Sequence, residues 1–140
     1  MNPEENKAVV RRFVKEIFEE LNSDAVNELV TEDFTWHRTG GNGDREFLRA
    51  ATARMAGALT NLAFAIDDEI AEGDRVAIRL RASGTAAADF PGITGSAGRN
   101  YSIEEIHIFR LRDGRVAEHW HQYDAMGQQA QLRGDGDSKA

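Results

Sequence analysis

The chain lacks several residue types and segments that whole classes of protein require. Its 140 residues contain no cysteine and only 2 prolines. Without cysteine there is no disulfide framework, no thiolate zinc site, no iron–sulfur cluster and no thiol nucleophile. Basic residues are also in the minority, 17 against 24 acidic ones, for a formal net charge of −7. This balance argues against a nucleic-acid partner, because non-specific binding needs clustered Lys and Arg at the phosphates.

Long apolar segments are missing too. No apolar run approaches membrane-spanning length, and the acidic start at residues 1–5 is unlike a signal peptide. We therefore expect a soluble cytoplasmic protein with no membrane partner. The length suits one compact core. We expect a single domain over residues 1–132 and a flexible tail over residues 133–140.

The first half of the chain has the periodicity of helices. Apolar residues recur at three- and four-residue steps over residues 4–21, which predicts an amphipathic helix. Ser23 is a suitable cap for a second, short helix, and residues 34–37 indicate a brief extended piece. Asp44 is a suitable cap for a third helix, which reaches Leu59.

After Asn61 the period changes from 3.6 to 2, the spacing of strands. Residues 72–74 suggest a hairpin, and residues 83–98, rich in Gly, Ala and Thr, indicate a loop or an irregular strand edge. Two further strands, over residues 101–112 and 115–124, meet at Asp113-Gly114. Helices followed by hairpins predict an α+β domain with its helices on one face of an antiparallel sheet.

The last predicted hairpin gathers most of the residues that can carry chemistry. It holds three of the 4 histidines, together with carboxylates and a phenol: Glu105, His107, Glu118, His119, His121, Tyr123 and Asp124. Which of them share a face depends on the turn, because a slip of one residue inverts every side chain.

Two turns fit the hairpin. A two-residue type I′ turn would pair Arg112 with Arg115. It would place on one face Glu105, His107, Trp120, Gln122 and Asp124. A type I turn with a glycine bulge would pair Leu111 with Arg115. It would set three pairs opposite each other: His107 with His119, Glu105 with His121, and Ile103 with Tyr123. We favour the bulged register because it gathers the imidazoles on one face and gives Trp120 apolar neighbours.

Plainer interpretations stand beside this one. Polar residues on a half-exposed strand commonly just face water, and His37 beside Trp36 fits a histidine at the edge of the core. His119 and His121 also form a His-x-His pair that can supply two metal nitrogens, with His107 or Glu105 as a third ligand. Because this spacing is a weak signal, we predict no metal.

Several segments carry a resemblance to a known family. They are Asn6-Lys7 with residues 9–13, Glu32-Asp33-Phe34 with His37, residues 71–76, residues 90–93 and residues 106–120. With these segments, from about Asn6 to Leu132, the chain resembles the SnoaL-like polyketide cyclases, which have a nuclear-transport-factor-like cone fold. The resemblance implies a curved antiparallel sheet around a conical pocket closed by N-terminal helices, in a homodimer or higher assembly.

The resemblance also implies a chemistry. Such cyclases use no cofactor: a carboxylate removes a proton next to a carbonyl, and the pocket stabilises the enolate during aldol ring closure. By position, the family's pocket histidine falls on His107. Its catalytic aspartate falls on His121, so this chain has an imidazole where the cyclases have a carboxylate.

We therefore expect a cofactor-independent cyclase, isomerase or lyase acting on a small hydrophobic carbonyl compound. His121 is the expected acid/base group and Glu105 its orienting partner, with His107 and His119 in contact with the substrate oxygen. Further substrate-binding candidates are Tyr123, His37, Trp36 and Asp124. Asp124 becomes the acid/base group only if the type I′ register holds. The alternatives are a non-catalytic small-molecule binding protein and a metal-dependent hydrolase that uses the His-x-His pair.

Overall fold

The computed structural model describes residues 1–134. Its main elements are α1 (Pro3–Phe13), α2 (Val26–Leu29), β1 (Val30–His37), α3 (Arg45–Ala58), β2 (Leu59–Glu72), β3 (Arg75–Ala86), β4 (Asn100–Arg112), β5 (Arg115–Tyr123) and α4 (Ala125–Arg133). The predicted α+β class is confirmed. The tail expected at 133–140 falls largely outside the described residues: Arg133 closes α4, Gly134 is its C-cap, and residues 135–140 are not described.

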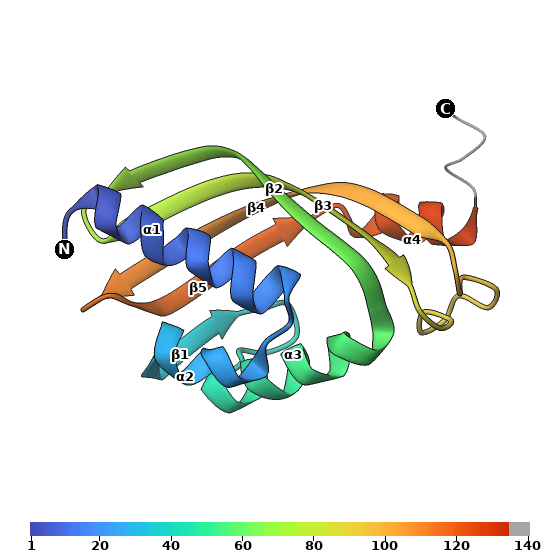
Figure 1. The fold of residues 1–140 in the computed structure, drawn as a ribbon, viewed down its shortest axis with the longest axis horizontal. Coiled ribbons are helices and arrows are strands. Elements are labelled where there is room, and N and C mark those ends of the chain that lie inside the picture. Colours follow the sequence, from blue (N-terminus) through green and yellow to red (C-terminus); the bar gives the residue numbers. More distant parts are fainter. Residues whose placement is uncertain (135–140) are drawn as a thin grey trace.

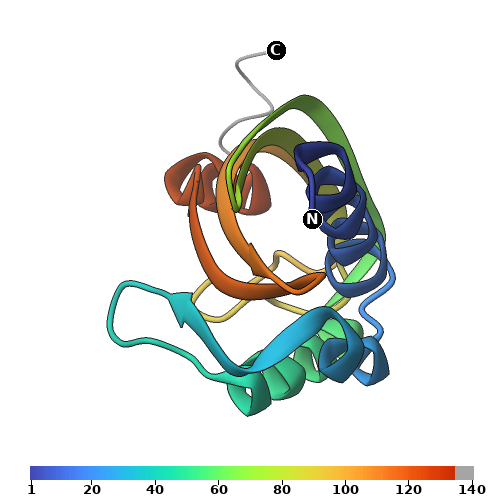
Figure 2. The same ribbon diagram turned by 90° about the vertical axis from the view of Figure 1, so that its left-hand side faces the viewer.

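The five strands form one curved sheet in the order β1-β5-β4-β3-β2. Strands β2 to β5 pair antiparallel, as their hairpin pattern predicts. Strand β1 differs, because it joins the edge parallel to β5. Figure 2 shows the sheet curling so that α1 lies against its concave side. The core therefore sits between this helix and the inner face of the strands.

Helix α1 supplies one wall of that core. Asn2 and Glu5 cap its start through a reciprocal pair of hydrogen bonds, with the Asn2 side chain 2.8 Å from the Glu5 N–H. Val10 and Phe13 are completely buried. The helix then widens into a π-helical segment, Val14–Glu19, instead of continuing as the regular helix expected to residue 21. This segment ends at Glu19, and Leu21 just beyond it has a φ of 53°, which a helix does not allow.

The next segment crosses to the far edge of the sheet and back (Figure 1). A short helical turn leads into α2, and the side chain of Asn22, not Ser23, caps it. Strand β1 is longer than the brief extended piece expected at residues 34–37. Asp44 caps α3 as predicted, accepting a hydrogen bond from the Phe47 N–H at 2.8 Å.

The β2–β3 hairpin turns at residues 73–74, as predicted. Strand β3 continues regularly to Ala86, four residues into the segment expected to be a loop, and the loop begins only after it. Gly84 lies in this strand at a closely packed position, where a Cβ would lie 2.8 Å from Leu62 Cδ2 and 3.2 Å from Tyr101 Oη. The side chains of β2 and β4 close over the glycine from both sides.

The C-terminal helix α4 was not predicted. Its apolar pattern is weak, and Leu132 is its one buried residue. Gln131 ties it to β4 by two hydrogen bonds with the Ser102 backbone, at 2.7 and 3.1 Å. In Figure 1 this helix covers the end of the sheet opposite the N-terminus of α1. No helix in the described part of the chain is both long and apolar enough to cross a membrane.

Candidate active site

The turn between β4 and β5 decides which side chains enter the cone. Asp113 and Gly114 both have positive φ, 52° and 79°, and Arg112 pairs with Arg115, which is the two-residue turn. The pairing then shifts within β5, so that Ala117 is an extra residue in that strand. This bulge exchanges the two faces of β5 beyond it.

The bulge gives a result that neither expected register contained. Beyond it, His107 lies opposite His121, and Glu105 lies opposite Tyr123. The predicted pairings of His107 with His119 and of Glu105 with His121 are therefore wrong. The predicted sharing of a face is correct: these five residues point to the concave side, because the bulge does in the strand what the favoured turn would have done. Trp120 lies on the convex side opposite Ile108, as expected.

Three of the concave residues form a continuous hydrogen-bonded chain. His107 Nε2 is 2.8 Å from Glu105 Oε1, and His107 Nδ1 is 2.8 Å from His119 Nε2. The two imidazole planes differ by only 9° and their centroids lie 5.1 Å apart. Rings this nearly parallel, with so short a contact between facing nitrogens, meet edge to edge. The contact therefore holds both rings in one orientation.

The chemistry of each group fixes where the protons lie. Glu105, as a carboxylate, only accepts, so a singly protonated His107 ring carries its proton on Nε2. His107 Nδ1 then accepts, and His119 must donate from its own Nε2. This leaves a lone pair on His119 Nδ1, which is buried without a hydrogen-bond partner. The chain thus runs from a partly exposed carboxylate to a closed, apolar end.

Aromatic rings make that end apolar. His119 is 1% exposed. The Phe109 ring lies parallel to it at 4.6 Å between centroids, and the Phe13 ring meets it edge-on at 5.9 Å. Burial lowers the pKa of His119 well below its ordinary value, with the neighbouring histidines adding to the effect. His119 is therefore neutral and remote from solvent, and the expected contact between its ring and a substrate oxygen stays a prediction.

The third imidazole has a different partner. The Trp36 indole Nε1 donates a hydrogen bond to His121 Nδ1 at 3.1 Å. Because an indole N–H can only donate, His121 Nδ1 must hold a lone pair and the neutral ring carries its proton on Nε2. The pKa of His121 is lowered to about 4, chiefly by burial and then by His107 and the positive charge of Arg38, against the opposing effect of Glu105. At neutral pH His121 thus offers an N–H donor.

Four residues form what we term the site rim: Trp36, Glu105, His121 and Tyr123. The Glu105 side chain is 16% exposed, Trp36 and His121 are partly buried, and Tyr123 is 47% exposed. The Tyr123 ring lies 5.6 Å from that of His121. These four residues are the exposed or partly exposed side of the site, and His107 and His119 lie buried behind them.

Two expected site residues lie elsewhere. His37 follows Trp36 on β1, and neighbouring residues of a strand point to opposite faces. Its ring stacks on Trp120 at 4.5 Å on the convex side, and its Nε2 lies 2.8 Å from Glu118 Oε2. Asp124 caps α4, accepting a hydrogen bond from the Gly127 N–H at 2.8 Å. Neither residue belongs to the rim.

Two residues on the concave face have properties that the sequence pattern does not predict. Trp36 was expected to line the pocket, but its position in the sequence does not predict a hydrogen bond to His121, which lies 85 residues further along the chain. Tyr101 was not considered at all. It faces the concave side on β4, and burial raises the pKa of its hydroxyl to about 12, so that it stays protonated. Alternation along the strand from His107 would have placed Tyr101 on this face.

Comparison with known proteins agrees with this architecture. The family model for the SnoaL-like polyketide cyclases matches residues 8–132. The chain belongs to this SnoaL-like family. Its sequence matches no curated protein. Among solved structures, TsrD from Streptomyces laurentii superposes with a TM-score of 0.82 at 26% identity, covering 94% of this chain and 97% of TsrD.

Two other structures show how broadly this SnoaL-like fold is shared. IdmH from Streptomyces antibioticus superposes with a TM-score of 0.77 at 26% identity, covering 91% of this chain and 97% of IdmH. A Catenulispora acidiphila protein with a ketosteroid isomerase-like fold superposes with a TM-score of 0.71 at 20% identity, covering 89% of this chain and 91% of its own. The second likeness concerns the fold alone.

Proposed function

We propose that this SnoaL-like protein is a cofactor-independent acid/base enzyme of the cyclase, isomerase or lyase type. Its substrate is a small, largely hydrophobic carbonyl compound that loses a proton from the carbon next to the carbonyl. The observation that carries the proposal is the pairing, on one rim, of a carboxylate held by a histidine chain with an imidazole N–H held by an indole. A proton acceptor beside an oxyanion donor is what enolate formation requires.

The hydrogen bonds exchange the roles that the sequence suggested. Glu105 is the proposed base, because its Oε1 is held by His107 and its Oε2 accepts no hydrogen bond from the described residues. His121 is the proposed electrophile, because the Trp36 bond leaves its Nε2 protonated. His107 and His119 position the carboxylate without contacting the substrate.

The resulting step balances simply. The α-carbon proton passes to Glu105 Oε2, and the electron pair it leaves forms the carbon–carbon double bond of an enolate. Negative charge develops on the carbonyl oxygen, where the His121 Nε2–H donates a hydrogen bond. In a cyclase the enolate carbon then attacks a second carbonyl of the same molecule, and the alkoxide that forms takes the proton back from the Glu105 carboxylic acid. In an isomerase it is reprotonated elsewhere, and the Glu105 carboxylic acid returns its proton.

The experiment follows exchange of α-protons for deuterium. An aryl methyl ketone such as acetophenone is incubated in D2O, and loss of its methyl signal is measured by ¹H NMR. The wild-type protein should accelerate this loss, and Glu105→Gln should slow it by about 10²- to 10⁴-fold. Glu104→Gln is the matched control, because Glu104 lies on the other face of β4, bonded to Arg79 at 2.9 Å. Equal rates for Glu105→Gln and the control would refute the assignment, and no acceleration by any variant would favour the binding-protein alternative.

A metal-dependent hydrolase is the second candidate, because nitrogens of His107, His119 and His121 lie within 4.8 Å of one another. Two nitrogens bound to one zinc at about 2.1 Å are at most about 4.2 Å apart. The three rings would have to meet that limit, and an ion bound by His107 Nδ1 would displace its hydrogen bond with His119. Stoichiometric zinc in protein purified without a histidine tag would support this candidate over the acid/base enzyme.

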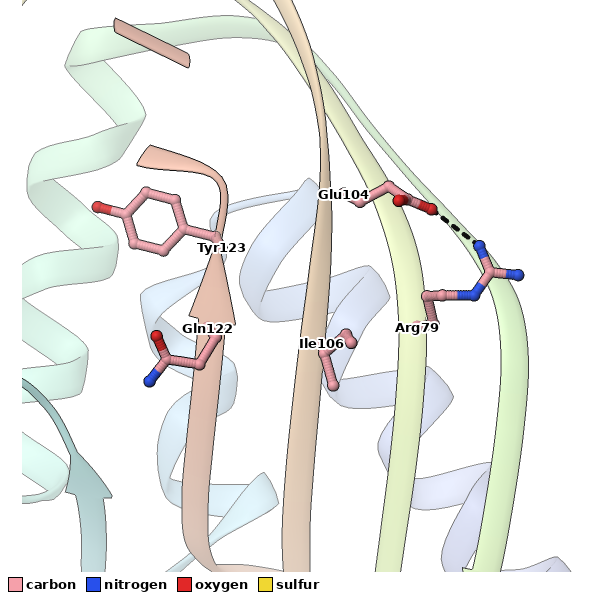
Figure 3. Close-up of a pocket in the computed structure, with 5 residues that line it drawn as sticks. All are labelled: Arg79, Glu104, Ile106, Gln122 and Tyr123. Atoms are coloured by element: carbon pink, nitrogen blue, oxygen red, sulfur yellow. Dashed lines mark hydrogen bonds and ion pairs between the residues drawn. The ribbon is translucent and has the colours of Figure 1, made fainter. Parts of the chain in front are cut away.

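We also propose that two copies associate through the convex face of the sheet. Ile106 is 54% exposed and Ile108 is 38% exposed there. Figure 3 shows Ile106 beside Gln122, next to the ion pair of Arg79 with Glu104. An apolar patch bordered by both signs of charge can face a copy of itself. Light scattering should report a dimer for the wild type and a monomer for Ile106→Glu, and a monomeric wild type would refute this assembly.

A further inference from the structure

A cation lies beside the rim on the aromatic side of the site. Arg38 directly follows β1 and is exposed. Its guanidinium carbon lies 5.0 Å from the centroid of the Trp36 ring and 4.5 Å from that of Phe47. Within the described part of the chain, no carboxylate forms an ion pair with it. Arg38 is thus held by two π faces, and no carboxylate among residues 1–134 neutralises its charge.

This mode of attachment leaves the useful part of the guanidinium free. Stacking on an aromatic ring uses the flat face of the group, whereas its N–H donors point outward in the plane. A stacked guanidinium therefore remains able to bind a carboxylate through two parallel hydrogen bonds. The two rings also limit its motion, which reduces the entropy lost when an anion binds.

The position of Arg38 ties it to the reacting groups. Trp36, on which the guanidinium lies, is the residue whose N–H holds His121. The positive charge of Arg38 is also one of the influences that lower the pKa of His121, after burial and the neighbouring His107. A molecule whose carbonyl oxygen accepts from His121 Nε2 therefore has Arg38 within reach on its Trp36 side.

The negative charge at the site, on Glu105 of β4, lies away from Arg38, which follows β1. Glu105, on β4, supplies the carboxylate, and Trp36 and Arg38 belong to the β1 side of the cluster. An anionic substrate would be repelled by Glu105 if its charge lay near the reacting carbon, and attracted by Arg38 if its charge lay at the other end. The arrangement thus favours one orientation of a bifunctional molecule.

We propose that Arg38 is a substrate-binding residue that takes a carboxylate, so that the substrate is a carbonyl compound bearing an acid group at the end away from the reacting carbon. This proposal rests on the proposed function for the position of the carbonyl. It narrows the substrate class from hydrophobic carbonyl compounds in general to aromatic or similarly apolar keto acids. Trp36 and Phe47 would then lie along the apolar body of the molecule.

A pair of probes tests the proposal. 4-Acetylbenzoate and 4-acetylbenzamide share their shape and ketone and differ in charge. By isothermal titration calorimetry, the wild type should bind the benzoate at least about tenfold more tightly than the benzamide, as expected for hydrogen bonds between charged groups. Arg38→Met should remove this preference and leave benzamide binding unchanged. The preference should also shrink as sodium chloride is raised.

Arg115→Met is the matched control. Arg115 is exposed at the β4–β5 turn, so its replacement removes the same charge far from Trp36 and should leave both affinities unchanged. Equal binding of the two probes by the wild type would overturn the proposal, as would no binding of either. Loss of both affinities in Arg38→Met would also overturn it, because it would show that Arg38 only supports Trp36.

The binding measurement separates this proposal from the one on which it rests. Glu105→Gln should bind 4-acetylbenzoate at least as tightly as the wild type, because it removes a negative charge from the site. If Glu105 is not the base, the Arg38-dependent preference still stands. If Arg38 binds no carboxylate, the effect of Glu105→Gln on α-proton exchange of a neutral ketone still stands.

Discussion

Replacing Trp36 by Phe removes the indole N–H that orients His121 and keeps an aromatic ring in its place. In the wild type, the 3.1 Å bond from Trp36 Nε1 requires a lone pair on His121 Nδ1. The tautomer with the proton on Nε2 is therefore favoured by the free energy of that bond. A net hydrogen bond contributes about 1 kcal/mol, which corresponds to a factor of about five in the ratio of the two tautomers.

Nuclear magnetic resonance of protein labelled with ¹⁵N-histidine measures this ratio directly. At pH 7 the wild type should show His121 with a protonated Nε2 and an unprotonated Nδ1. Trp36→Phe should shift the ratio toward the Nδ1-protonated tautomer by about the factor of five and lower enolisation activity with it. Trp120→Phe is the control, because this second tryptophan stacks on His37 on the other face of the sheet. A wild-type His121 protonated on Nδ1, or a Trp36→Phe spectrum identical to that of the wild type, would refute the reasoning.

Three further predictions concern stability. Between pH 6.5 and 4 an unfolded His121 takes up a proton that the folded one does not, because burial lowers the folded pKa to about 4. The free energy of unfolding should therefore decrease as the pH is lowered from 6.5 to 4. His121 contributes about 2 kcal/mol to this decrease after allowance for solvent screening. Chemical denaturation at pH 7 and pH 4.5 should therefore show a smaller loss of unfolding free energy in His121→Gln than in the wild type, and an equal loss would contradict the shift. Gly84→Ala should lower the free energy of unfolding by about 1–3 kcal/mol, because the new Cβ would lie 2.8 Å from Leu62 Cδ2; Gly57→Ala, at an open helical position, should not, and equal midpoints would contradict the close packing. Asp44→Ala should cost about 1 kcal/mol through loss of the α3 cap, with Asp44→Asn largely restoring it in thermal melts; an unchanged melting temperature in Asp44→Ala would show that the cap contributes nothing.

The features of the fold that follow from local patterns were predictable. The change of period after Asn61 locates the strands, and Asp44 marks the start of α3 because a carboxylate before an apolar repeat can accept from the first free N–H groups. The parallel pairing of β1 was not predictable, because its partner lies at the other end of the chain. Helix α4 was missed because its one buried residue gives no helical periodicity.

The site shows the same division between local and distant information. The sequence placed three imidazoles and Glu105 on one face, but for the wrong reason, since the bulge lies at Ala117 and not in the turn. In the structure two consecutive buried residues, Val116 and Ala117, mark the bulge. The sequence does not locate it, because both of the expected turns fit the residues around Asp113-Gly114. The partners of each imidazole depend on residues from other elements. Alternation along β4 and β5 therefore gives the members of the cluster without their proton positions.

The buried chain behind Glu105 explains why the histidine cluster need not share one role. Hydrogen bonds from His119 to His107 and from His107 to Glu105 fix the orientation of the carboxylate. The tautomer of His121 is fixed instead by the hydrogen bond from Trp36 on another strand. Two independent sets of hydrogen bonds thus set an acceptor and a donor side by side. The proposed mechanism therefore requires that Glu105, and not His121, takes the substrate proton.

The most direct test of that requirement compares Glu105→Gln with His121→Gln in the α-proton exchange assay. A glutamine at position 121 can still donate a hydrogen bond to an enolate oxygen but cannot take a proton, and a glutamine at position 105 cannot act as a base. If Glu105 is the base and His121 the donor, His121→Gln should keep at least about a tenth of the wild-type rate, while Glu105→Gln should lose about 10²-fold or more. Loss of exchange in His121→Gln together with survival in Glu105→Gln would contradict the account.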